Sequence, residues 1–203
     1  MPTIYQLKPA FQNLLRPIAS AIVRSGGTAN QVTVLAMLGS IAVGATIYFY
    51  PEAQWPLILI GPWLFARMAL NAIDGMLARE HGQKSALGGV LNELGDVISD
   101  AALYLPLACV PAFGPVLIVV VVLLAMLTEM AGVVCVQIGA SRRYDGPFGK
   151  SDRAFVFGAM SLAVGLGYEG AWVNWVLMVM AALSAVTVVN RVRAGLRELS
   201  HEG

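Results

Sequence analysis

Six long apolar stretches, separated by short polar or Pro- and Gly-containing links, constrain this chain more than any other feature. They cover approximately residues 32–50, 55–78, 87–110, 114–138, 154–168 and 172–191. A helix of about 20 mostly apolar residues is long enough to cross a bilayer. With 58% of the 203 residues hydrophobic and only 12% charged, one soluble core could not bury this surface. The sequence therefore predicts an all-α integral membrane protein, a six-transmembrane-helix bundle in a single domain over residues 1–203.

The basic residues predict the orientation in the membrane. With six spans, twelve of the 13 Lys and Arg residues fall on one side, and the thirteenth, Arg67, lies inside a span. The opposite side carries Glu52 and Glu169 and no base. Lys and Arg accumulate in cytoplasmic loops. We therefore expect both termini to be cytoplasmic.

Residues 1–27 precede the first apolar stretch and form a juxtamembrane segment. Their apolar residues recur at spacings of three and four, with polar residues between them: Leu7, Phe11, Leu14, Leu15, Ile18 and Ile22. This period is that of an amphipathic helix. Such a helix either lies in the membrane interface or packs as an ordinary helix against the bundle, and the pattern alone leaves both open.

Acidic and amide side chains interrupt the second and third stretches. Asn71 and Asp74 are spaced i, i+3, whereas Asn92, Asp96 and Asp100 are spaced i, i+4, i+8, so each set lies on one face of a helix. The two helices are joined by a short loop, and their polar faces can meet near the cytoplasmic surface. We expect a small pocket there, rich in oxygen atoms and open to the cytoplasm.

Acidic groups gathered in a region of low dielectric stay ionised only when a cation neutralises them. Carboxylate and amide oxygens favour a hard divalent ion, Mg²⁺ or Mn²⁺, and the absence of His and Cys from the two faces disfavours zinc. One alternative is a purely structural set of hydrogen bonds and ion pairs with Arg67 or Arg79. Another is the ion relay of a small transporter, although the inverted repeats and broken spans typical of transporters are not found.

The order and spacing of these residues resemble the signature of the CDP-alcohol phosphatidyltransferase family, D-x-x-D-G-x-x-A-R followed by G-x-x-x-D-x-x-x-D. The matching positions are Asn71, Asp74, Gly75, Ala78, Arg79, Gly88, Asn92 and Asp96. The entry to the first span at Thr28–Asn30 and the segment Gly149–Lys150 are also similar to the family. Segments such as MALNAIDGMLARE and NELGDVISDAALYLP look most like its YnbA-type bacterial branch.

The resemblance implies a six-helix bundle, usually a homodimer, in the bacterial inner membrane. It implies transfer of a phosphatidyl group from CDP-diacylglycerol to an alcohol, with release of CMP, in phospholipid biosynthesis. It also implies Mg²⁺ or Mn²⁺ as the cofactor, one or two ions, with Asp74, Asn71 and Asn92 at ligand positions. Asp96, at the last position of the motif, would be a further ligand and the catalytic base. The residues expected to border the nucleotide are Gly75, Ala78, Arg79, Gly88 and Asn30.

Asparagine stands at two of the four aspartate positions of the motif, Asn71 and Asn92. An amide oxygen can still bind Mg²⁺, but it brings no charge. Three interpretations follow: Glu93 or Asp100 supplies the missing charge as a ligand; the site holds one ion and a second arrives with the donor; or the protein has lost transfer activity and binds a CDP-lipid or nucleotide as a regulatory protein.

The loop between the fourth and fifth stretches is basic. Lys150, Arg153 and Arg143 could hold the phosphate of an acceptor, because guanidinium groups bind phosphate in a bidentate manner. The acceptor would then be a phosphorylated polyol such as glycerol 3-phosphate or an inositol phosphate. The alternative is that these bases only set the topology and contact anionic lipid headgroups. No basic patch interleaved with aromatic residues indicates a nucleic-acid partner.

Overall fold

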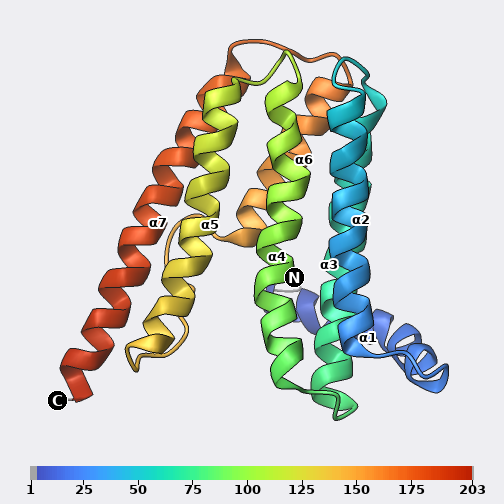
Figure 1. Cartoon of the computed structure of the whole chain (residues 1–203), viewed down its shortest axis with the longest axis vertical. Coiled ribbons are helices and arrows are strands. Elements are labelled where there is room, and N and C mark those ends of the chain that lie inside the picture. Colours follow the sequence, from blue (N-terminus) through green and yellow to red (C-terminus); the bar gives the residue numbers. More distant parts are fainter. Residues whose placement is uncertain (1–3, 203) are drawn as a thin grey trace. The chain divides into compact units, whose positions relative to one another are not determined.

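The computed structural model describes residues 4–202, and within that range every regular element is a helix (Figure 1). The α-helices are α1 (Ile4–Arg24), α2 (Ala29–Phe49), α3 (Trp55–Glu80), α4 (Ala86–Tyr104), α5 (Pro115–Gln137), α6 (Lys150–Gly165) and α7 (Trp172–Glu202), and a 3₁₀ helix, η1, spans Leu105–Cys109. The chain forms two compact units. The first unit holds residues 4–42 and 62–99, and the second unit holds residues 43–61 and 100–202.

The apolar stretches end where local chemistry dictates. α2 begins at Ala29 because Thr28 and Gln31 cap it reciprocally: the Gln31 N–H donates to Thr28 Oγ1 at 3.3 Å, and the Thr28 N–H donates to Gln31 Oε1 at 2.9 Å. α6 begins at Lys150, four residues before the expected start, because Asp152 accepts the Gly149 N–H at 2.8 Å. At the end of α4, Pro106 has no N–H to donate, and the chain continues as η1.

Within the first unit, α1 shares a core with α2 and α3. Leu15 and Ala19 of α1 are buried together with Val32 of α2 and with Ile73 and Leu77 of α3. Figure 1 shows α1 running across the direction of α2 rather than alongside it. The apolar pattern within α1 therefore packs against α2 and α3.

A second apolar side of α1 is not used for that packing. Leu14 and Ile18, one helical turn apart, are 71% and 50% exposed. On its polar side, Arg16 Nε donates to Glu80 Oε2 at 3.1 Å and links α1 to the end of α3.

The second unit is centred on α5 and α7. Its buried residues come from several helices and include Leu103, Ile118, Phe157, Val173 and Leu177. Tyr104 of α4 stacks on Phe157 of α6 with ring centroids 4.1 Å apart. The end of α2 approaches α4 closely, since a Cβ on Gly44 would lie only 1.9 Å from the carbonyl oxygen of Ala102.

Four helices of the described chain are long and apolar enough to cross a membrane, namely α2, α3, α5 and α7. Many of their large apolar side chains face outward, among them Leu35, Leu38, Phe65, Val116, Met130 and Trp175. Such a surface suits contact with lipid. The chain is thus an all-helical integral membrane protein; α4, which carries three acidic residues, and α6, with 16 residues, fall outside that group of four.

Candidate active site

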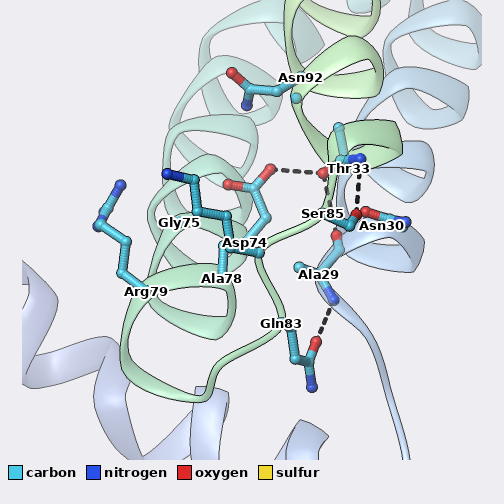
Figure 2. Close-up of a pocket in the computed structure, with 13 residues that line it drawn as sticks. Ala29, Asn30, Thr33, Asp74, Gly75, Ala78, Arg79, Gln83, Ser85 and Asn92 are labelled. Carbon is cyan, nitrogen blue, oxygen red and sulfur yellow. Dashed lines mark hydrogen bonds between the residues drawn. The ribbon is translucent and has the colours of Figure 1, made fainter.

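A cavity of about 340 Å³ lies in the first unit, between the start of α2, the end of α3 and the start of α4 (Figure 2). Its lining residues are Ala29, Asn30, Thr33, Asp74, Gly75, Ala78, Arg79, Gln83, Lys84, Ser85, Gly88, Gly89 and Asn92. The structure therefore brings together all five residues expected to border a nucleotide and two of the expected metal ligands, Asp74 and Asn92. Asn71 and Asp96 are not among the residues that line this cavity.

Two glycines of the motif keep the cavity open. A Cβ on Gly75 would lie 2.7 Å from Arg79 Nη2, and a Cβ on Gly88 would lie 2.9 Å from Asn30 Oδ1. Any side chain at Gly88 would also approach Ser85 Oγ, at 3.1 Å. Glycine at these positions leaves room for a ligand beside the backbone.

The acidic group of the cavity is Asp74, which is 5% exposed. Thr33 Oγ1, on α2, donates a hydrogen bond to Asp74 Oδ2 at 2.8 Å (Figure 2). This contact orients the carboxylate toward α2.

Gln83 connects the α3–α4 loop to the entry of α2. Its Oε1 accepts the Ala29 N–H at 2.7 Å, and its Nε2 donates to the carbonyl of Gly27 at 3.3 Å. The first N–H groups of a helix have no intrahelical partner, so the Gln83 amide satisfies one of them. The loop that closes one side of the cavity is thereby fixed to α2.

Asp96, the expected base, is held by α3. Arg67 Nη2 donates to Asp96 Oδ1 at 3.3 Å and to its backbone carbonyl at 3.1 Å. Asn71 Nδ2 donates to the same Oδ1 at 3.4 Å. The alternative interpretation, in which an acidic residue pairs with Arg67, thus holds for Asp96.

Asp100, one turn beyond Asp96 on α4, belongs to a second charged cluster. This cluster, the arginine cluster, lies in the second unit and comprises Asp100, Thr128, Glu129, Arg142, Arg153 and Arg191. Arg153 Nη2 lies 3.8 Å from Asp100 Oδ2 and 2.9 Å from Glu129 Oε1, and its Nη1 donates to Thr128 Oγ1 at 3.0 Å. The side chain of Arg153 is almost fully buried, with 1% exposed.

Glu129 contacts two more guanidinium groups. Arg142 Nη2 lies 3.3 Å and Arg191 Nη1 lies 3.5 Å from Glu129 Oε2. Arg191 also donates to the backbone carbonyl of Thr128. Three arginines therefore surround one glutamate, with Asp100 at the edge, and positive charge exceeds negative charge by one.

The other two bases expected to bind an acceptor are Arg143, within the loop between α5 and α6, and Lys150, directly after it. Arg143 pairs with Asp145 through Nε at 2.8 Å and with Glu198 through Nη1 at 2.7 Å. The hydrogen bond from Arg143 holds the pKa of the Asp145 carboxyl below its ordinary value. Lys150 is the first residue of α6 and is half-buried.

The cavity offers oxygen ligands of the kind that a hard cation prefers, but only a few of them. Asp74 and the amide of Asn92 offer oxygen atoms, and no His or Cys lines the cavity. Among residues whose side chains the structure describes, no group of three or more His, Cys, Asp or Glu side chains is arranged to hold a metal ion. Asparagine at position 92, where the family motif has aspartate, removes one carboxylate from this lining.

Sequence reasoning missed several residues of the two sites. Thr33 and Gln83 line the cavity, and Thr33 follows Asn30 at i+3, a spacing that could have indicated it. Glu129 was not assigned to the acceptor region, because its partners Arg142, Arg153 and Arg191 come from three separate segments.

Comparison with known proteins identifies the family. The family model for CDP-alcohol phosphatidyltransferase matches residues 27–189. The inner membrane protein YnbA of Escherichia coli (strain K12) is 43% identical over 198 residues, 96% of each chain. The phosphatidylinositol phosphate synthase of Mycobacteroides abscessus is 28% identical over 193 residues, covering 92% of this chain and 86% of that relative.

Solved structures share the fold. The crystal structure of Mycobacterium tuberculosis phosphatidylinositol phosphate synthase with CDP-DAG bound aligns with a TM-score of 0.76 at 21% identity, covering 88% of this chain and 92% of that one. The same synthase in complex with manganese and citrate aligns with a TM-score of 0.72 at 22% identity, covering 89% and 88%. The resemblance to the YnbA-type branch is confirmed, and the chain belongs to the CDP-alcohol phosphatidyltransferase family.

Proposed function

We propose that this protein transfers a phosphatidyl group from CDP-diacylglycerol to an alcohol acceptor and releases CMP. The observation that carries the proposal is the cavity of the first unit, where Asn30, Gly75, Arg79 and Gly88 line one space together with the buried Asp74. Its volume of about 340 Å³ is within the range of small-molecule sites. The nucleotide of the donor would lie against the glycines, with the exposed Arg79 near its phosphates.

The chemistry requires a base and charge neutralisation. The acceptor oxygen attacks the phosphorus that carries the diacylglycerol, the bond from that phosphorus to the CMP oxygen breaks, and the hydroxyl proton goes to a carboxylate. Asp96 suits this role because Arg67 and Asn71 both donate to its Oδ1 and hold the carboxylate in one orientation.

A divalent ion, Mg²⁺ or Mn²⁺, would be held by Asp74 with amide oxygens of the motif asparagines. When bound, it neutralises charge that develops on the departing CMP. The sparse set of carboxylates in the cavity fits one ion better than two. The synthase of Mycobacterium tuberculosis, which shares this fold, has been solved with manganese, in support of this assignment.

We further propose a phosphorylated polyol as the acceptor, such as glycerol 3-phosphate or an inositol phosphate. The arginine cluster supports this, because its three guanidinium groups exceed the negative charge of Glu129 and Asp100. Lys150 and Arg143 lie on the neighbouring loop and are kept as candidates for the same phosphate, although Arg143 is paired with Asp145 and Glu198. Relatives named phosphatidylinositol phosphate synthase point to the same class of acceptor.

The membrane arrangement belongs to the proposal as well. All six helices from α2 to α7 cross the membrane, both termini are cytoplasmic, and α1 lies in the interface, which the exposure of Leu14 and Ile18 supports. The protein acts as a homodimer in the bacterial inner membrane.

The decisive experiment uses purified protein in mixed micelles with labelled CDP-diacylglycerol and a set of alcohols and phosphorylated polyols. CMP release that depends on an acceptor and on Mg²⁺ or Mn²⁺ is the expected result. Asp96→Asn should lower turnover at least about a hundredfold while CDP-diacylglycerol still binds. Glu169→Gln, on an exposed loop, is the matched control. Tight binding of CDP-diacylglycerol without CMP release for any acceptor would instead identify a regulatory CDP-lipid-binding protein.

A further inference from the structure

We propose that the guanidinium of Arg67 is a built-in cation of the active site and occupies the place that a second divalent ion would otherwise take beside Asp96. This inference rests on the proposed function, because it concerns how the same site balances its charge. It explains in one step why an arginine lies within a membrane span and why two motif positions carry asparagine.

The first observation in support of this inference is the position of Arg67. Arg67 and Asn71 are spaced i, i+4 on α3, so both lie on the helix face that approaches Asp96. The residue is only 3% exposed, and a buried guanidinium is tolerated only with a close acceptor. Its acceptors include the side chain and the backbone carbonyl of Asp96, at 3.3 and 3.1 Å.

The direction of the Asn71 amide supports it next. Asn71 turns its Nδ2 donor toward Asp96 Oδ1, at 3.4 Å. A metal ion shared by these two residues would need the amide oxygen on that side, because a cation binds lone pairs and not N–H groups. The Asn71–Asp96 contact is therefore arranged for a carboxylate neutralised by donors.

The charge count gives the same result. Asp74 and Asp96 bring two negative charges, and Arg67 returns one positive charge. With aspartate at positions 71 and 92, the same sum would be −3. Arg79 and Lys84, which also line the cavity, bring the present sum from −1 to +1, and the two negative charges of the donor's pyrophosphate then leave −1, a charge that one divalent ion balances more closely than two.

The charge of Arg67 and the charge of a bound metal ion differ in their dependence on metal concentration, and this difference can be measured. Arg67 is part of the chain, so its charge is present at any metal concentration. The protein should bind one Mn²⁺ per chain in the presence of CDP-diacylglycerol, and its activity should rise with Mn²⁺ along a curve for a single site.

The test counts bound Mn²⁺ by electron paramagnetic resonance and isothermal titration calorimetry on the detergent-solubilised protein with CDP-diacylglycerol. The wild type should bind one ion. Asn71→Asp with Asn92→Asp should raise the affinity for that ion about tenfold or more, because ligand charge is added. Adding Arg67→Met to this pair should raise the number of bound ions to two, whereas adding Arg67→Lys, which keeps the cation, should leave it at one.

Two ions bound to the wild type would overturn the inference, as would a triple variant with Arg67→Met that still binds one. If Arg67→Met does not fold in this pair, Arg67→Gln, which keeps a hydrogen-bond donor and removes the charge, takes its place and should likewise give two ions. The outcome is separable from that of the proposed function: two ions in a protein that releases CMP refute only the role of Arg67, whereas one ion in a protein that never releases CMP refutes only the transfer reaction.

Discussion

The change Glu129→Gln tests the arginine cluster directly. Glutamine keeps the shape of the side chain and removes its charge, so the contacts to Arg153 at 2.9 Å, Arg142 at 3.3 Å and Arg191 at 3.5 Å lose their electrostatic attraction. Arg153 and Arg191 have side chains only 1% and 2% exposed, and solvent therefore cannot replace the carboxylate.

The expected cost follows from that burial. Removal of one partner from a buried ion pair destabilises a protein by about 3–5 kcal/mol, since it leaves uncompensated charge. Here one carboxylate serves three guanidinium groups, and Asp100, at 3.8 Å from Arg153, compensates only in part. We therefore expect a loss of at least about 3 kcal/mol, a large part of a typical net stability of about 5–15 kcal/mol.

The assay is unfolding by SDS titration in mixed micelles, followed by far-ultraviolet circular dichroism. Glu169→Gln, in an exposed loop, serves as the control and should change stability by less than about 0.5 kcal/mol. A loss below about 1 kcal/mol for Glu129→Gln would refute the view that this carboxylate holds the three arginines together.

The same unfolding experiment, repeated with inorganic phosphate, tests whether the arginine cluster binds phosphate. If the arginines bind the phosphate of an acceptor, inorganic phosphate should take the place of the missing carboxylate. A ligand at 100 times its Kd restores about 2.7 kcal/mol. The variant should therefore be stabilised by phosphate far more than the wild type is. Equal responses of the two proteins would argue against an acceptor phosphate at this cluster.

Three glycine substitutions test the packing and the cavity. Gly44→Ala should lower stability by about 1–3 kcal/mol in the SDS titration, because its Cβ would lie 1.9 Å from the Ala102 carbonyl oxygen. Gly88→Ala, whose Cβ would lie 2.9 Å from Asn30 Oδ1, should raise the KM for CDP-diacylglycerol about tenfold, a change of about 1.4 kcal/mol; an unchanged KM would exclude Gly88 from the donor site. Gly61→Ala has open space around it and should leave both properties unaffected.

The helices followed from the sequence because apolar length is a strong signal, and the boundaries followed less well because they depend on single contacts. The start of α6 is set by Asp152 and the Gly149 N–H, and one hydrogen bond moved it by a turn relative to the apolar pattern. The 3₁₀ segment after Tyr104 depends on Pro106, which the sequence displays, but apolarity continues through it and conceals the change.

The candidate site, too, could be predicted only in part. Motif spacing places Asp74, Gly75 and Gly88 on helix faces that meet, and the cavity there could be predicted. The hydrogen-bond and ion-pair partners of the site residues could not be predicted, because they depend on contacts between segments that are distant in the sequence. From the sequence, Arg67 could pair with any of several carboxylates, and the structure shows an ion pair with Asp96.

The packing of α1 has a practical consequence for anyone who shortens this protein. Leu15 and Ala19 pack in one core with Ile73 and Leu77, which flank Asp74 in the sequence. A truncation that starts at α2 would strip the cover from the very turn of α3 that carries Asp74. Helix α1 thus supports the turn of α3 that carries Asp74, and an N-terminal fusion should leave α1 able to pack against α2 and α3.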